Sequence, residues 1–317
     1  MKFIACVFMF AALGLTRIAP TALADSPPPY LFEWHSAGPG PDSLFSPYGI
    51  AVGGAASAYV YVCDVRLHRI LKFSKLGSLL GQWPSSAVSL AVGPQGEVYA
   101  PEVPENRLTV YDESGTVLRQ WGPHGGQTTP IGQAVGLGPT GDVYVIAGFG
   151  VQRFANDGTF ILDWGGKFDP TFSCPPGTFF APVGIAVAPN GNVYVSDVVQ
   201  GRGCQRVQEF TGTGSFVNQW FVADVRGLHS DQFGYIYWSR AGLHNSQIEK
   251  HSGDGALVWT LGSIGTDPGQ FYSNDCAIDS YGNIFVADLQ SNRIEVFGNL
   301  TTPAPRATWG TIRRLYR

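Results

Sequence analysis

The sequence predicts an all-β fold, a six-bladed β-propeller, and three observations point to it. A hairpin phrase recurs six times, a third strand follows each copy, and a fourth strand usually ends in Trp. Four strands repeated about every 40 residues are typical of a propeller blade. A lone hairpin is only marginally stable in water, so we expect the copies to stack against one another. The clearest copy is PVGIAVAPNGNVYVSD, at 182–197.

That copy indicates how each hairpin forms. Hydrophobic and small residues alternate over 183–187, as in a half-buried strand. Pro-Asn-Gly at 189–191 is a turn signal, because Gly tolerates the backbone angles of tight turns. A β-branched and aromatic run then resumes at 193–195. The other five copies lie at 46–64, 87–102, 132–147, 225–240 and 273–288.

A third and a fourth strand follow the hairpins. The third begins with Arg in the segments 69–74, 107–112, 206–211 and 293–298. The fourth ends at Trp83, Trp121, Trp164, Trp220 and, without a final Trp, Gly262. Acid–base pairs flank the turn between strands two and three, and we expect them to be structural ion pairs across a hairpin. These are Asp64–Arg69, Glu102–Arg107, Asp197–Arg206 and Asp288–Arg293.

The N-terminal strand is expected to close the ring. The segment YLFEW, at 30–34, reads as a fourth strand without its first three, whereas the copy at 273–288 needs a fourth. A strand at about 30–35 that completes the last blade removes an exposed edge. The alternative is a strand at 307–310, but the segment before it contains two prolines and lacks the turn Gly. The propeller is therefore expected to span 30–299.

Both ends of the chain read as segments outside the propeller. Residues 1–24 carry Lys2, an apolar run at 3–15 and an Ala-Leu-Ala cleavage site, which is typical of a secretory signal peptide. The alternative, a membrane anchor, needs about 20 apolar residues. Residues 25–29 form a proline-rich linker. The tail at 300–317 is basic and aromatic, and is either a surface-attachment signal or a solvated end.

The net charge of the chain limits the classes of partner that we expect. The whole chain has a net charge of −4, and loss of Lys2 and Arg17 with the signal peptide leaves 18 basic against 24 acidic residues, or −6. An acidic protein lacks the basic face that nucleic acids require, so we expect no nucleic-acid partner. We expect a secreted or periplasmic protein.

The repeated motif resembles that of a known family. P-x-G-I-A-V, then G-N-V-Y-V-x-D, then R-I-x-x-F, then a Gly and a Trp resemble the NHL repeat over nearly the whole chain. The resemblance implies the propeller architecture. It does not imply one activity, because NHL propellers include lyases, nucleic-acid binders, sensor ectodomains and scaffolds.

One enzyme among NHL propellers, the peptidylglycine amidating lyase, is similar at 64–73, DVRLHRILKF. That family places zinc-binding histidines at the mouths of first strands. The matching positions here hold no histidine, so the zinc site is not carried over and a lyase is kept only as the last alternative. They are Tyr48, Val88, Gln133, Val183, Arg226 and Asn274.

The face that carries the long loops is the expected binding face. Strand order places the mouths of the first strands there, together with the loops between strands two and three. We expect a binding module for a protein, a peptide or a small polar ligand, and assign no catalytic residue and no cofactor. The alternative is that these mouth groups only satisfy one another and water. The candidate binding residues are Tyr48, Gln133, Arg226, Asn274 and Asp275.

A calcium-dependent lactonase of the gluconolactonase type is the second interpretation. Asn274 and Asp275 are suitable oxygen ligands, with Gln133 or Asp224 nearby. However, the early Glu-Gly-Pro of such enzymes is missing, and Arg226 would repel a cation.

Cysteines and one histidine complete the predictions. Cys174 and Cys204 fall on the loop-rich face within blade four, and in an oxidising compartment we expect a disulfide between them. Cys63 and Cys276 either pair or remain small buried thiols. His229 breaks a column of small residues, and we expect it to be a hydrogen-bonded channel residue rather than a metal ligand.

Overall fold

The computed structural model describes residues 26–35, 40–54, 58–124, 131–166, 174–198, 204–242 and 245–299. The expected signal peptide at 1–24 and the tail at 300–317 lie outside these ranges, as does the strand alternative at 307–310. Within them, no helix is long and apolar enough to cross a membrane.

Six four-stranded antiparallel sheets form the blades. Blades 1 and 2 consist of β2 (Pro47–Gly53), β3 (Tyr59–Asp64), β4 (Arg69–Ser74), β5 (Leu79–Pro84), β6 (Ala91–Val92), β7 (Val98–Glu102), β8 (Arg107–Tyr111) and β9 (Val117–Trp121). Blades 3 and 4 consist of β10 (Ile131–Leu137), β11 (Val143–Ala147), β12 (Gly150–Phe154), β13 (Phe160–Gly165), β14 (Pro182–Val187), β15 (Val193–Asp197), β16 (Arg206–Phe210) and β17 (Phe216–Phe221). Blades 5 and 6 consist of β18 (Val225–Ser230), β19 (Ile236–Gly242), β20 (Asn245–His251), β21 (Leu257–Leu261), β22 (Ser273–Ile278), β23 (Ile284–Asp288), β24 (Arg293–Phe297) and β1 (Tyr30–His35).

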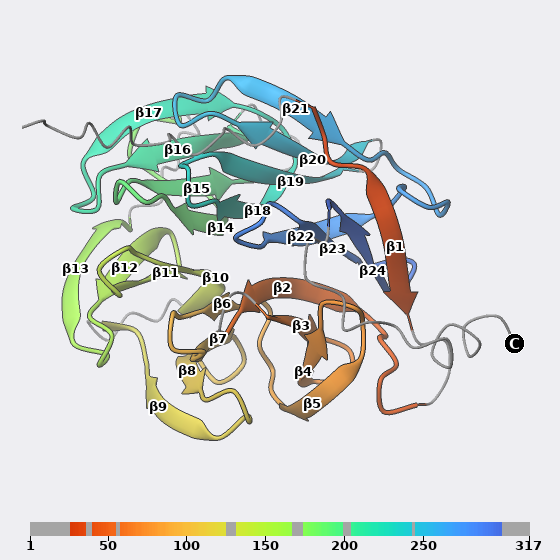
Figure 1. Cartoon of the computed structure of the whole chain (residues 1–317). Coiled ribbons are helices and arrows are strands. Elements are labelled where there is room, and N and C mark those ends of the chain that lie inside the picture. The colour runs from red at the N-terminus through yellow and green to blue at the C-terminus, as the bar shows by residue number, and fades with distance from the viewer. Residues whose placement is uncertain are drawn as a thin grey trace, which may run out of the picture.

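The six first strands contact one another in a closed ring, in the order β2, β6, β10, β14, β18, β22 and back to β2. The N-terminal strand closes this ring, since β1 pairs with β24 and completes blade 6. Figure 1 shows the red β1 alongside the blue β24. The predicted six-bladed propeller, completed by the N-terminal strand, is confirmed.

A contact between a Trp and a Gly joins neighbouring blades, and the same contact joins the last blade to the first. The turn between strands three and four of each of blades 1 to 5 holds a Gly with positive φ, and the Trp of the preceding blade packs on it. In blade 1 this is Gly77, where a Cβ would lie 2.6 Å from Cγ of Trp34. The N-terminal strand therefore supplies the Trp through which blade 6 packs on blade 1. The other pairs are Trp83–Gly115, Trp121–Gly158, Trp164–Gly214 and Trp220–Gly255.

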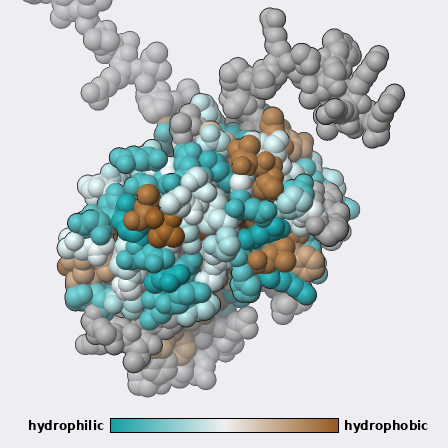
Figure 2. Space-filling view, turned by 90° about the horizontal axis from the view of Figure 1, so that it is seen from below, coloured by the Kyte–Doolittle hydropathy of each residue, from teal (hydrophilic) through white to brown (hydrophobic). Residues whose placement is uncertain are grey.

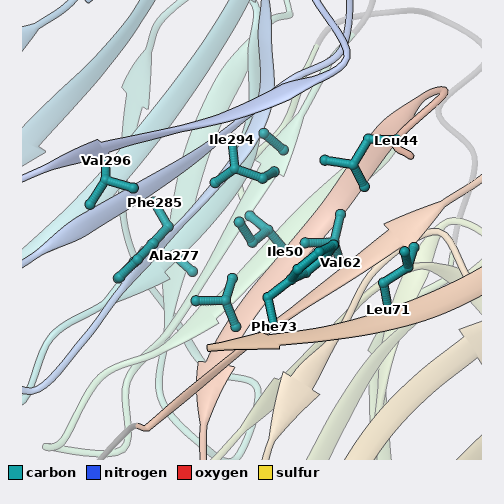
Figure 3. Close-up of a cluster of buried hydrophobic side chains, with 11 residues drawn as sticks. Leu44, Ile50, Val62, Leu71, Phe73, Ala277, Phe285, Ile294 and Val296 are labelled. Carbon is teal, nitrogen blue, oxygen red and sulfur yellow. The ribbon is translucent and has the colours of Figure 1, made fainter. Parts of the chain in front are cut away.

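Hydrophobic clusters fill the spaces between blades. The cluster at the closure joins blades 6 and 1, with Phe285 and Val296 on one side and Ile50 and Phe73 on the other (Figure 3). Phe285 and Phe73 are 0% and 1% exposed. Burial of each phenyl ring contributes about 1.5–3 kcal/mol. This seam therefore stabilises the ring at the place where the chain itself is discontinuous.

The acid at the end of the second strand fixes the loops of the site-bearing face. In blades 1, 4 and 6 its carboxylate accepts a backbone N–H of the segment that enters the first strand, as from Ala181 to Asp197 at 2.7 Å and from Tyr272 to Asp288 at 3.1 Å. Burial raises the pKa of Asp197, and the neighbouring backbone N–H groups and Arg206 oppose that rise. The four predicted ion pairs form, with N–O distances of 4.0 Å for Asp64–Arg69, 2.7 Å for Glu102–Arg107, 3.6 Å for Asp197–Arg206 and 3.0 Å for Asp288–Arg293.

The outer strands leave hydrophobic side chains exposed. On the side seen in Figure 2, hydrophobic residues form separate patches within a mainly hydrophilic surface. The exposed hydrophobic residues of the fourth strands are Leu80, Val117, Leu118, Ile161, Phe216, Val217, Phe221 and Leu257. The central channel, rather than this rim, brings polar groups together.

Candidate functional site

The site is the central channel, a cavity of about 210 Å³ lined by all six first strands. Three rings of residues, each with one equivalent residue from every blade, follow it inward. The mouth ring holds Tyr48, Val88, Gln133, Val183, Arg226 and Asn274. The middle ring holds Ala51, Ala91, Gly136, Ala186, His229 and Ala277. The deep ring holds Val52, Val92, Leu137, Val187, Ser230 and Ile278.

All five residues proposed from the sequence line this channel. Four of them belong to the mouth ring, and Asp275 lies one step deeper. The side-chain amide of Asn274 donates to the carbonyl of Tyr48 at 3.4 Å, so blades 6 and 1 are linked at the mouth. Gln133 is exposed, whereas Arg226 is half-buried. The mouth ring therefore holds most of the polar groups, and the two rings below it hold small and aliphatic side chains except at His229 and Ser230.

Asp275 occupies a position that is small in every other blade. The equivalent residues are Gly49, Ser89, Ala134, Gly184 and Gly227. Space is the reason: a Cβ on Gly49 would lie 2.6 Å from the Val88 carbonyl oxygen of the next blade. A Cβ on Gly227 would collide with the Asp275 carboxylate itself. Gly227 in blade 5 therefore makes room for the larger side chain of blade 6.

The Asp275 carboxylate contacts His229 of the neighbouring blade. Nε2 of His229 lies 2.8 Å from Oδ1 of Asp275. The same carboxylate accepts the backbone N–H of Cys276 at 3.0 Å and that of Ile50 at 3.3 Å. Since Asp275 accepts from two fixed donors, Nε2 is best placed to be the protonated nitrogen and the third donor. His229 is thus hydrogen-bonded in the channel wall, as expected from the sequence.

Within the part of the chain that the structure describes, the guanidinium of Arg226 has no protein partner. Every other arginine in the described ranges has a carboxylate within ion-pair distance or, for Arg66, the Phe45 ring 4.6 Å away. The guanidinium of Arg226 has neither among these residues. A half-buried, unpaired guanidinium at a cavity mouth can bind an anionic group through two parallel hydrogen bonds.

Comparison with known proteins places this geometry among propellers. No protein-family model matches the sequence. The human NHL repeat-containing protein 3 is 28% identical over 160 residues, which cover 45% of this chain and 44% of that protein. The chain thus spans under half the length of this curated relative.

Solved structures agree on the architecture. A gluconolactonase from Xanthomonas campestris has a TM-score of 0.60 at 16% identity, covering 81% of this chain and 87% of that one. A streptogramin B lyase has a TM-score of 0.58 at 16% identity, covering 85% and 98%. The resemblance to NHL-type propellers is confirmed. At these identities, the solved structures establish the fold alone.

The channel of this propeller is poorly suited to a metal ion. No group of three His, Cys, Asp or Glu side chains in the described part of the chain could hold one. Asp275, the carboxylate expected to bind calcium, is already engaged by His229 and two backbone N–H groups, and Arg226 lines the same cavity. Asp224 does not line the channel. The residues present therefore do not fit calcium.

The four cysteines in the described ranges form one disulfide and two free thiols. Cys174 and Cys204 form a disulfide with a Cα–Cα distance of 5.7 Å, as predicted, and thereby tie the segment before β14 to the segment before β16. Arg206 donates to the carbonyl of Cys174 at 2.7 Å. Cys63 and Cys276 are free and buried, so their pairing is wrong and the alternative of two buried thiols holds. Burial raises the pKa of both thiols.

Sequence reasoning missed the contact between His229 and Asp275. Each residue was singled out, one as a break in the middle ring and the other as a mouth acid. The missing step was that Asp275 also breaks a column of small residues, one position before Cys276. Two breaks in adjacent blades were the available signal.

Proposed function

We propose that this NHL-type propeller is a secreted binding module that holds a small polar ligand at the mouth of its central channel. The observation that carries the proposal is Arg226, an unpaired guanidinium among the described residues, which lines the cavity beside Asn274 and Asp275. A cavity of about 210 Å³ suits a small molecule better than a folded partner. The Cys174–Cys204 disulfide supports an oxidising, extracellular location.

A thermal-shift screen tests this proposal. The purified protein is screened against small anions, cations and neutral polar compounds. A true ligand at one hundred times its Kd stabilises the folded state by about 2.7 kcal/mol, which raises Tm by roughly 5 °C. We expect Arg226→Gln and Asn274→Ala to abolish the shift. Arg66→Gln, which removes an exposed arginine outside the channel, should leave it unchanged.

The proposal fails in either of two outcomes. One is that no compound in the screen stabilises the protein. The other is that the stabilising compounds act equally on wild type and on the Arg226→Gln and Asn274→Ala variants, which would place the ligand elsewhere.

A calcium-dependent lactonase stays the second candidate, supported by the likeness of fold to the gluconolactonase from Xanthomonas campestris, with a TM-score of 0.60. The engaged carboxylate of Asp275 counts against it. Metal analysis of the purified protein and a lactone panel test it. Stoichiometric calcium whose removal by EDTA abolishes lactone hydrolysis would replace the binding module with this enzyme.

A further inference from the structure

Departures from the repeat gather in one sector of the channel. β18 contributes Arg226 and His229, and its neighbour β22 contributes Asn274 and Asp275. Across the ring, β6 lies opposite β18 and β10 lies opposite β22, and these two blades contribute mainly small and aliphatic side chains. These are Val88, just before β6, Ala91 and Val92 on β6, and Gly136 and Leu137 on β10, with Ser89 and Gln133 as the polar exceptions. The channel therefore has one polar wall and one apolar wall.

The charges of the polar wall favour a ligand with a single negative charge. Arg226 supplies one positive charge that no described protein group neutralises, and the one nearby acid, Asp275, is held by His229 and two backbone N–H groups. A monoanion would balance Arg226. A dianion would bring an unbalanced second charge beside the Asp275 carboxylate. A planar carboxylate also matches the two-pronged geometry of a guanidinium.

The hydrogen bonding of His229 favours a donor group on the same ligand. In the tautomer that donates to Asp275 through Nε2, Nδ1 presents a lone pair. No described residue donates to Nδ1, and the side chain is 22% exposed and lines the channel. A ligand hydroxyl can donate to it. Arg226 and His229 are three residues apart on β18, which spans roughly 10 Å at most, so several carbons separate the two ligand groups.

We infer that the ligand is a small hydroxylated monocarboxylate. Its carboxylate binds Arg226 at the mouth, its hydroxyl donates to Nδ1 of His229 one ring deeper, and its carbon chain lies against the apolar wall of β6 and β10. The inference rests on the proposed function and names the chemical class of its ligand.

Isothermal titration calorimetry with a matched compound series tests the inference. The probes are ω-hydroxy carboxylates of three to six carbons, the alkanoates of the same length, and the corresponding ω-hydroxy amides. We expect one hydroxy carboxylate to bind best. Its amide should bind about 10- to 100-fold more weakly, because the charge-assisted pair is lost. Its alkanoate should bind about 3- to 10-fold more weakly.

The repeat itself supplies variants that should fold. His229→Ala and Arg226→Val give blade 5 the residue types that other blades carry at these positions, such as Ala186 and Val183. In His229→Ala the preference for hydroxy carboxylate over alkanoate should disappear. In Arg226→Val the preference for carboxylate over amide should disappear. His124→Gln, an exposed histidine outside the channel, should keep both preferences.

The outcomes separate this inference from the proposed function. If other compounds bind in a manner that Arg226→Gln abolishes, while every hydroxy carboxylate fails to bind, the binding module stands and the ligand class is wrong. Equal affinity for acid and amide, or a hydroxyl preference that survives in His229→Ala, also overturns the ligand class. If no compound of any class binds, both proposals fall.

Discussion

Replacement of Glu295 by Gln should remove a pH-dependent weakness from the blade that closes the ring. Arg293 on β24 faces three carboxylates: Glu33 on the closing strand β1 at 2.7 Å, Asp288 at 3.0 Å and Glu295 at 2.8 Å. One cation cannot balance three anions in a buried site. Oε2 of Glu295 also has no hydrogen-bond partner among the described residues. Glu295 is therefore the acid that retains a proton.

The magnitude follows from the pKa. Burial, assisted by the charges of Asp288 and Glu33 and opposed by Arg293 and the Gly269 N–H, raises the pKa of Glu295 from 4.5 to about 7. A pKa raised in the folded state contributes stability that is present below pH 4.5 and is lost as the pH rises through about 7. Each pKa unit corresponds to about 1.4 kcal/mol, so the loss amounts to about 3 kcal/mol by pH 8.

Denaturant titrations of wild type and Glu295→Gln at pH 5 and pH 8 measure this loss. The free energy of unfolding of the variant relative to wild type should rise by about 2.5 kcal/mol between the two pH values, because a smaller part of the loss has already occurred at pH 5 and titrating groups outside this cluster cancel in the difference. Glu105→Gln, at an exposed carboxylate, is the control and should show no such rise. A difference between Glu295→Gln and wild type that is the same at both pH values would refute the reasoning.

Two further predictions concern the bridge and the blade contact. The double variant Cys174→Ser, Cys204→Ser opens a loop with a sequence separation of 30 and should lower the free energy of unfolding by up to about 3.6 kcal/mol. Dithiothreitol should lower it equally in wild type and not at all in the variant, and a wild type insensitive to the reductant would contradict this. Gly77→Ala, at φ +84° and against Trp34, should cost at least about 1–2 kcal/mol in the same titration. Gly81→Ala, with no atom within 4 Å of the added Cβ, should change it by less than about 0.5 kcal/mol, and an equal effect of the two would contradict the Trp-on-Gly contact.

The architecture could be predicted because each repeat carries the same local signals for turns and strands. The turn Gly of each hairpin, such as Gly191 at φ +86°, is needed for its own backbone angle. The acid at the end of strand two, such as Asp197, binds groups of its own blade. The closing strand could be found because Trp34 repeats the pattern of the other fourth strands. Each of these signals is readable within one repeat.

The chemistry of the channel could be predicted only in part, because it depends on contacts between repeats. The mouth residues follow from their position at the start of each first strand, and all five line the cavity. The residues that these side chains contact cannot be predicted from that position. Arg226 resembles any exposed arginine in the sequence, and only the ion pairs of the other arginines in the described ranges distinguish it. The free state of Cys63 and Cys276 likewise depends on how two blades face each other.

The pair His229–Asp275 indicates how function can arise in a protein built of copies. A large residue at a position that is small in the other blades creates a steric conflict. In blade 1 this position is Gly49, and a Cβ added there would lie 2.6 Å from the Val88 carbonyl oxygen of the next blade. The conflict is resolved here by a second and a third departure: Gly227 leaves space for the carboxylate, and His229 binds it at 2.8 Å. Residues 46 positions apart thus depend on each other through one shared wall of the channel. A stack of identical blades would have a uniform channel, whereas coupled departures on β18 and β22 give this one a polar side. That asymmetry is what allows the channel to orient a ligand.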